Sequence, residues 1–199
     1  MSDFRIDKIT NRDGSAGTQI CGVSTFSGTT GMVMPGGPTE YRGGRGRGVY
    51  TGGTSPDTLQ GVNSMSYIEI ATTGNAMDFG DLTAARNDAQ AVSNATRGLF
   101  GGGGQDAPAN DQTNLIDYIT IATLGNAKEF GDLSYARQSH SACSSPTRGV
   151  WTNGYRYSPA GHVADMDYVQ IATTGNAVDF GDSTSAQGNV ANSNGRGGL

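Results

Sequence analysis

The sequence is built around the segment Tyr118-Ile119-Thr120-Ile121-Ala122-Thr123-Leu124-Gly125-Asn126-Ala127-Lys128-Glu129-Phe130-Gly131-Asp132-Leu133. Related copies occupy residues 67–82 and 168–183, and all three contain Gly-Asn-Ala followed by Phe-Gly-Asp. An Arg-Gly pair followed by apolar or aromatic residues keeps the same spacing, at residues 47–50, 97–100 and 148–151. A period of roughly 50 residues is typical of propeller blades and solenoid units. The chain is therefore a repeat protein of three units.

Each unit is predicted to contain four short strands. In the first unit these are residues 48–51, 67–71 and 76–82, and a small-residue segment that follows Arg86 and includes Val92. Tyr, Ile, Glu, Ile and Ala alternate over 67–71 as in a half-buried strand. Short connections predict antiparallel pairing. Four-stranded units at this period favour β-propeller blades over solenoid coils, so the sequence predicts an all-β fold.

Composition indicates a thin hydrophobic core. The chain has 199 residues, of which 35% are hydrophobic and 32 are glycine. Sheets of this composition pack through small residues and bury little apolar surface within one chain. Burial of further apolar surface between subunits would add stability, so we expect a homo-oligomer. The net charge of -5 argues against a nucleic-acid surface, although the Arg-Gly run at 41–48 resembles RNA-binding segments in composition. There is no apolar run of membrane-span length and no signal-peptide pattern, so we expect cytoplasmic assembly without membrane insertion.

Residues 1–46 lie outside the repeats and are predicted to form an extended N-terminal arm, followed by the repeat module at 47–199. Glycine and β-branched residues make helix unfavourable there, so one or two short strands are expected. Apolar side chains favour docking of the arm on a partner over a free linker. The candidate anchoring residues are Ile20, Val23, Phe26, Met32 and Met34.

The units resemble kelch repeats. The shared features are a glycine pair, a tyrosine strand, an aromatic strand and a following arginine. The glycine pairs are at 52–53 and 101–102, the tyrosines are Tyr67, Tyr118 and Tyr168, phenylalanines replace the usual tryptophan at Phe79, Phe130 and Phe180, and the arginines are Arg86 and Arg137. The third unit departs from the pattern, with Asn153-Gly154 and Gln187.

A closer resemblance covers nearly the whole chain. The arm segment at 9–26, followed by the phrase Ile-Ala-Thr-Thr-Gly-Asn-Ala and then Phe-Gly-Asp, is similar to structural proteins in virions of tailed phages of marine cyanobacteria. The resemblance implies a virion component, such as a tail, fibre or surface element. Its expected partners are other virion proteins and further copies of itself.

The sequence predicts no catalytic, cofactor or metal site. His140 and His162 have no recurring partner, and no nucleophile motif surrounds a serine. The Asp that follows each Phe-Gly could in principle bind calcium, but one carboxylate per unit is more typical of a turn. Cys21 and Cys143 lack metal-type spacing. Arg86 and Arg137 are expected to bridge to the next unit rather than to bind a ligand.

The loops between the second and third strands differ most among the units. They span 54–64, 104–114 and 155–165. A constant scaffold with variable loops indicates binding. The third loop has aromatic and polar residues suited to sugar or protein contact, and an inter-subunit packing patch is the alternative. Its candidates are Trp151, Tyr155, Arg156, Tyr157 and His162, and they suggest a second function, a host-surface carbohydrate-binding adhesin.

The C-terminus repeats the opening of a unit and then stops. Its strand candidate consists of Asn189, Val190, Ala191, Asn192 and Ser193, with an Arg-Gly pair at 196–197. The first unit lacks such an opening strand, and proteins cover exposed strand edges. One hypothesis is strand exchange between two subunits, which would give a ring of six units. The alternative is that residues 18–35 supply the missing strand within the chain.

Overall fold

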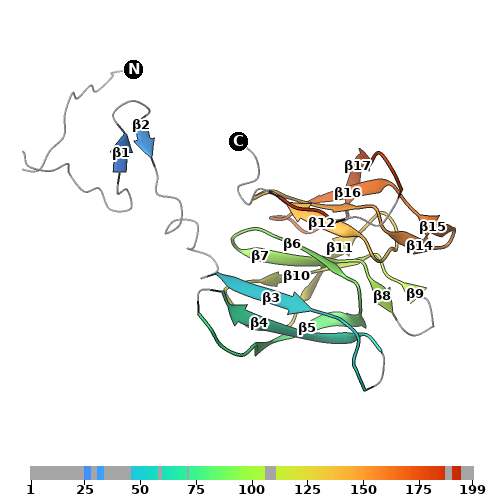
Figure 1. The fold of residues 1–199 in the computed structure, drawn as a ribbon, viewed down its shortest axis with the longest axis horizontal. Helices are drawn as coiled ribbons and strands as arrows, with labels where there is room; N and C mark the ends of the chain where they lie inside the picture. Colours follow the sequence, from blue (N-terminus) through green and yellow to red (C-terminus); the bar gives the residue numbers. More distant parts are fainter. Residues whose placement is uncertain are drawn as a thin grey trace, which may run out of the picture. The chain divides into compact units, whose positions relative to one another are not determined.

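The computed structural model describes residues 25–27, 31–33, 46–57, 60–70, 72–105, 111–186 and 190–193. The chain divides into two compact units, Met1–Arg42 and Gly43–Leu199. Each unit is described by itself (Figure 1).

The smaller unit contains a hairpin of two short strands, as the sequence predicts. These are β1 (Thr25–Ser27) and β2 (Gly31–Val33), which pair antiparallel with Phe26 opposite Met32. The other candidate anchoring residues, Ile20, Val23 and Met34, lie outside the described residues.

The larger unit contains three main antiparallel sheets, one per repeat, and two small two-stranded ones (Figure 1). The first sheet consists of β3 (Arg47–Thr51), β4 (Val62–Glu69) and β5 (Met77–Arg86). The second consists of β6 (Gln90–Ser93), β7 (Arg97–Gly101), β10 (Leu115–Thr120) and β11 (Lys128–Asp132). The third consists of β12 (Ser141–Ser144), β13 (Arg148–Thr152), β16 (Asp165–Gln170) and β17 (Val178–Asp182). The all-β prediction is confirmed.

The prediction of four strands in every unit is wrong for the first sheet, because the small-residue strand β6, assigned to the first unit from the sequence, pairs with β7 in the second sheet. The first sheet has three strands in the order β3-β4-β5, whereas the second and third begin with the small-residue strands β6 and β12. Its strands are also longer than the sequence predicts: β4 starts at Val62 rather than Tyr67, and β5 continues to Arg86. Register shifts at Val62/Ser64 and Met65/Ser66 let this pair extend, because bulges absorb unmatched residues.

Two small hairpins occupy positions where loops were expected. β8 (Gly104–Gln105) pairs with β9 (Asp111–Gln112), and β14 (Tyr155–Tyr157) pairs with β15 (Ala160–His162). Each lies between the second and third strands of its sheet. Among the residues described at this place in the first sheet, Thr54 and Gly61 form an isolated bridge and no hairpin is present. Strand-forming aromatic residues in β14 explain why the third loop orders as a hairpin.

The hydrophobic core lies between neighbouring sheets. We call the contact of the first with the second sheet the first junction, and that of the second with the third the second junction. Buried residues of the first junction are Met65, Tyr67, Phe79, Leu82, Phe100, Ile119 and Ala127. Those of the second are Val92, Leu99, Ile116, Phe130, Leu133, Trp151, Val169 and Ile171. The three sheets are therefore held together by two similar apolar layers.

Candidate functional site

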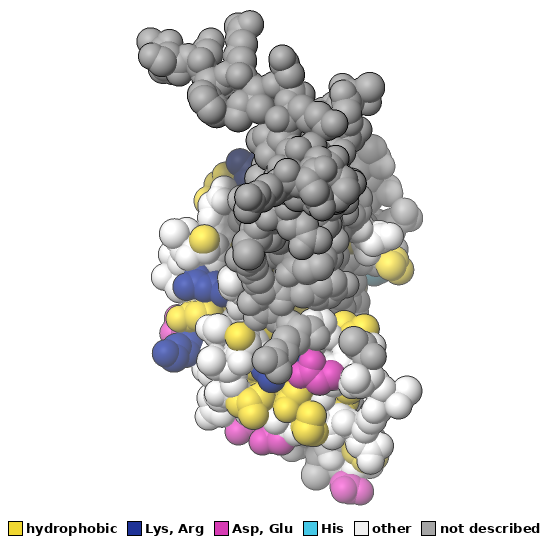
Figure 2. Space-filling view, turned by 90° about the vertical axis from the view of Figure 1, so that its left-hand side faces the viewer, with side chains coloured by type: hydrophobic (Ala, Val, Ile, Leu, Met, Phe, Trp, Pro, Cys, Tyr) yellow, Lys and Arg dark blue, Asp and Glu magenta, His cyan; other side chains and the backbone are white. Residues whose placement is uncertain are grey.

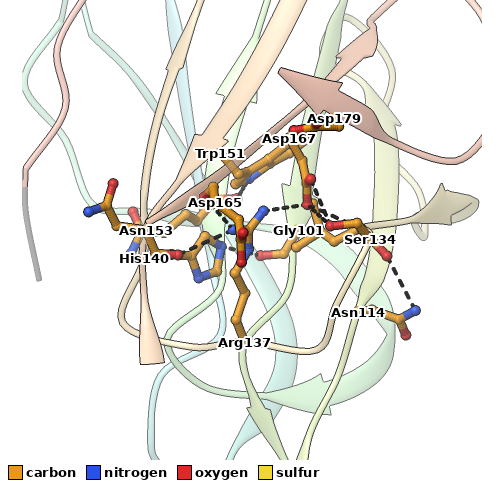
Figure 3. A network of polar contacts seen from close by, with 12 residues as sticks. Gly101, Asn114, Ser134, Arg137, His140, Trp151, Asn153, Asp165, Asp167 and Asp179 are labelled. Atoms are coloured by element: carbon orange, nitrogen blue, oxygen red, sulfur yellow. Dashed lines mark hydrogen bonds and ion pairs between the residues drawn. The ribbon is translucent and has the colours of Figure 1, made fainter. Parts of the chain in front are cut away.

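A buried ion pair crosses each junction. At the end of β5, Arg86 donates from Nη2 to Oδ2 of Asp117 at 3.0 Å and to the Phe100 carbonyl at 3.1 Å. Both charged side chains are fully buried. In the second junction, Arg137 pairs with Asp167 in the same way (Figure 3). The prediction that these arginines bridge to the next unit is confirmed.

Each aspartate of these pairs is also held by a hydroxyl from the preceding sheet. Thr83 Oγ1 donates to Asp117 Oδ1 at 2.6 Å, and the Thr83 amide donates to Oδ2 at 3.2 Å. In the second junction, Ser134 Oγ donates to Asp167 Oδ1 at 2.7 Å (Figure 3). These bonds satisfy carboxylates that would otherwise be costly to bury.

Two opposing effects act on the pKa of each arginine, and the net result is a lowered pKa for both. Burial lowers the pKa of Arg86, because desolvation disfavours the charged form, and the carboxylate of Asp117 opposes this effect. Burial lowers the pKa of Arg137 in the same way, and Asp167 opposes it. A guanidinium stays protonated in proteins, so both pairs remain ionic.

The repeated phrase forms a backbone contact between sheets. In the first junction, the Gly125 amide donates to the Phe79 carbonyl at 2.9 Å, and the Ala127 amide donates to the Asp81 carbonyl at 2.8 Å. The Asp81 amide donates in return to Oδ1 of Asn126 at 3.1 Å. The Gly-Asn-Ala turn of one sheet is thus bound by the Phe-Gly-Asp strand of the sheet before it.

The second junction repeats this contact. The Gly175 amide donates to the Phe130 carbonyl at 2.8 Å, the Ala177 amide donates to the Asp132 carbonyl at 2.7 Å, and the Asp132 amide donates to Oδ1 of Asn176 at 3.2 Å. The repetition shows that the recurring residues hold each sheet against the next.

Close backbone approach explains the glycine within Phe-Gly-Asp. A Cβ placed on Gly80 would lie 2.6 Å from the backbone of Gly125, and one on Gly131 would lie 2.5 Å from that of Gly175. Both glycines also have positive φ angles, of 136° and 152°. A side chain is therefore excluded at this position both by the neighbouring turn and by the local conformation.

Trp151 lies in the second junction and not beside the third loop, where sequence reasoning grouped it. Its side chain is fully buried, and Nε1 donates to the Gln90 carbonyl at 3.0 Å. His140 lies nearby, 2% exposed, with Nε2 at 3.1 Å from the Gly101 carbonyl (Figure 3). Burial, reinforced by the positive charge of Arg137, lowers the pKa of His140 to about 3. Both residues have a packing role here.

The other four candidates of the third loop are brought together by the β14–β15 hairpin. The Tyr155 ring contacts the rings of Tyr157 and His162 edge to face, each with centroids 5.4 Å apart. Arg156 lies 3.7 Å from the centroid of the Tyr135 ring and also pairs with Asp165. We call Tyr155, Arg156, Tyr157 and His162 the aromatic hairpin.

Two glutamines hold the aromatic hairpin in place. Gln112 of β9 donates from Nε2 to the Tyr155 carbonyl at 2.8 Å and accepts from the Tyr157 amide at 2.9 Å. Gln138 donates from Nε2 to the Tyr157 hydroxyl at 3.2 Å. Tyr157 remains 38% exposed. The hairpin therefore presents an exposed tyrosine ring beside polar groups, and hydrogen bonds with Gln112 and Gln138 fix its position.

Four of the five C-terminal candidates are described, and these form no strand in the structure. Residues 190–193 have no strand pairing, and Val190 is 97% exposed. Asn189 lies outside the described residues.

Comparison of the sequence with protein-family models and with curated proteins gives no match. Among the described residues, no group of three or more His, Cys, Asp or Glu side chains could hold a metal ion. No helix in the described part of the chain is long and apolar enough to cross a membrane.

Proposed function

We propose that the chain is a non-enzymatic structural component of a tailed-phage virion, associated with the tail or fibre or decorating the surface. Its three sheets act as kelch-like propeller blades that form a rigid interaction platform, and the N-terminal arm anchors the platform on a neighbouring virion protein. The virion setting comes from the resemblance of the arm and of the repeated phrase to cyanophage structural proteins.

One observation carries the platform role. The residues shared by the repeats make the contacts between sheets, as with Arg86 to Asp117 and Gly125 to Phe79. The residues that differ most lie in the hairpins β8–β9 and β14–β15. A constant framework that carries variable hairpins is suited to recognition of other molecules.

Fractionation of particles tests this function. Particles of the phage that encodes the chain would be purified by density gradient, washed with high salt and analysed by peptide mass spectrometry. The chain should co-sediment with the known structural proteins and withstand the wash. A replication enzyme of the same phage is the control and should be absent. Recovery of the chain only in the soluble lysate would contradict the proposal.

The aromatic hairpin favours a second function, binding of a host-surface glycan. The exposed ring of Tyr157, whose amide and hydroxyl bond to Gln112 and Gln138, can stack on a sugar ring while neighbouring polar groups bond to its hydroxyls. Glycan-array binding by the purified chain would be compared with that of the Tyr157→Ala variant. Binding that is lost in the variant supports the adhesin. Tyr118→Phe, which alters a tyrosine outside the hairpin, is the control.

A further inference from the structure

The outer face of the first sheet has the composition of a junction but is exposed. We call the face formed by Tyr50, Ile68 and Ile70 the leading face. Tyr50 occupies the position of Phe100 and Trp151 in the next two sheets, yet it is 52% exposed, whereas they are 3% and 0% exposed. Surface aromatic residues in such a setting mark a contact with another molecule.

The two isoleucines of the leading face follow the same pattern. Ile70 is 67% exposed, whereas its counterpart Ile171 in the third sheet is fully buried. Ile68 is 37% exposed, whereas Ile119 in the second sheet is 3% exposed. The leading face therefore presents the apolar surface that the second and third sheets bury against the sheet before them. One side of the molecule also displays apolar side chains beside acidic and basic ones (Figure 2).

The outer face of the third sheet has the residues that would complete a junction with the leading face of another copy. We call the strand segment Phe180-Gly181-Asp182 the trailing face. Phe180 is 49% exposed, whereas its counterparts Phe79 and Phe130 are 2% and 3% exposed. A Cβ on Gly181 would meet no described atom within 4 Å. The trailing face thus retains the glycine that elsewhere receives a Gly-Asn-Ala turn, and the first sheet has such a turn at 74–76.

A paired change in charge links the two faces. Ser66 stands in the first unit where the next two units have Asp117 and Asp167. Gln187, which lies outside the described residues, stands in the third unit where the first two have arginine. If the third sheet of one copy meets the first sheet of another, both residues at that junction are neutral. Neither face then buries an unpaired charge, which would cost several kcal/mol.

The open edge of β3 offers a place for the C-terminal segment. In the second sheet, β6 pairs with β7, but the first sheet has no strand at the corresponding edge of β3 among the described residues. A cavity of about 100 Å³ lies between β3 and the second sheet, lined in part by Val49, Val92 and Phe100. Residues 190–193 follow the third sheet along the chain as β6 follows the first, so in a neighbouring copy they would fill this edge.

We infer that two copies of the chain bind each other head to tail, with the trailing face of each against the leading face of the other. The 74–76 turn of one copy binds the trailing face of its partner, and residues 190–193 pair with β3. Two chains bring six sheets together, within the roughly four to eight of closed propellers, and closure leaves neither face exposed. This inference deepens the proposed function by naming one partner, a second copy.

Solution mass with two glutamate variants tests the inference. The full-length protein should have twice the mass of one chain by analytical ultracentrifugation. Ile70→Glu places a charge in the leading face and should shift the species to the single-chain mass. Leu124→Glu is the matched control, because Leu124 is 56% exposed but lies in the turn between β10 and β11 of the second sheet, and it should leave the pair intact. A single-chain mass for the parent, or a pair that resists Ile70→Glu, would overturn the inference.

Complementation gives a sharper test of which faces meet. Ser66→Asp and Gln187→Arg each place one unpaired charge in the proposed junction, so each variant alone should dissociate. Mixed together, they should form a heterodimer in which one junction has the Asp–Arg pair and the other has the parental residues. Failure of the mixture to associate, or full association of each variant alone, would overturn the assignment. A single-chain protein that still co-sediments with particles would refute only the pairing, and a pair absent from particles would refute only the virion role.

Discussion

The two junctions share one polar framework but differ in what fills the space around it. In both, a buried arginine pairs with an aspartate of the next sheet. In the first junction Phe100 occupies the position where Trp151 lies in the second. The hydrogen bonds therefore set how one sheet lies on the next, and the apolar side chains set how well the space is filled.

The second junction is also the one in which glycines make room for large side chains. A Cβ on Gly101 would lie 2.8 Å from the Trp151 ring, and one on Gly102 would lie 2.8 Å from the His140 ring. The position of His140 is occupied by Ala89 in the preceding unit. The comparison shows that a degenerate repeat can keep its framework while exchanging the side chains packed around it.

The largest expected effect comes from breaking the framework itself. Asp167→Leu leaves the buried Arg137 without its counter-ion and should destabilise the protein by about 3–5 kcal/mol in urea unfolding. Asp117→Leu in the first junction should have a similar cost, because Arg86 is equally buried. The double variant Arg137→Met/Asp167→Leu should recover most of the loss. A small effect of Asp167→Leu would show that the framework does not hold the sheets.

Trp151→Phe places in the second junction the same side chain that Phe100 provides in the first. It removes the bond from Nε1 to the Gln90 carbonyl and leaves unfilled volume. We expect a loss of about 2–3 kcal/mol in thermal or urea unfolding. The control Phe100→Leu should cost less, because no hydrogen bond is lost. An unchanged stability of Trp151→Phe would show that both junctions accept either aromatic residue equally.

The second junction should weaken in acid because of His140. Its pKa in the folded protein, about 3, lies below the ordinary value of 6.5, so the unfolded chain takes up the proton first. Stability is then full above pH 6.5 and falls as the pH drops toward 3, by up to about 1.4 kcal/mol per pH unit. His140→Gln should flatten this slope in urea unfolding between these pH values. His162→Gln is the matched control and should keep the parental slope.

The smallest expected effect is one that should be equal in both junctions. Asn126→Ala and Asn176→Ala each remove a side-chain acceptor from a backbone amide of the preceding sheet. Each should cost about 1 kcal/mol, because the site is exposed and water replaces the bond. Unequal losses in thermal unfolding would show that the two turns are not equivalent.

Much of the architecture was predictable because the relevant signals are local. The alternation in β4, the Gly-Asn turns and the spacing of the units predicted antiparallel strands in three similar sheets, and the sheets are observed. The bridging role of Arg86 and Arg137 was also predictable, since a charged residue repeated at the end of a strand must find a partner in each copy.

Other features were not predictable because they join distant parts of the chain. The aromatic hairpin was grouped correctly in part, but Trp151 was assigned to it from closeness in sequence and lies instead in the second junction. The loop at 155–165 gave no clear alternation, so its two short strands were missed. Ser134 was not singled out as a partner of Asp167. A usable signal was present, because a hydroxyl residue lies three positions before the arginine in each of the first two units, as Thr83 does before Arg86.

The sequence by itself determined the number of repeats, the strand content and the turns, because backbone conformation and strand periodicity depend on neighbouring residues. Only the tertiary structure decided that the Gly-Asn-Ala turn of one unit binds the Phe-Gly-Asp strand of the unit before it. The residues of that contact, such as Asp81 and Asn126, are 45 positions apart. Their meeting depends on how whole sheets pack, and burial of the apolar layers between the sheets determines that packing.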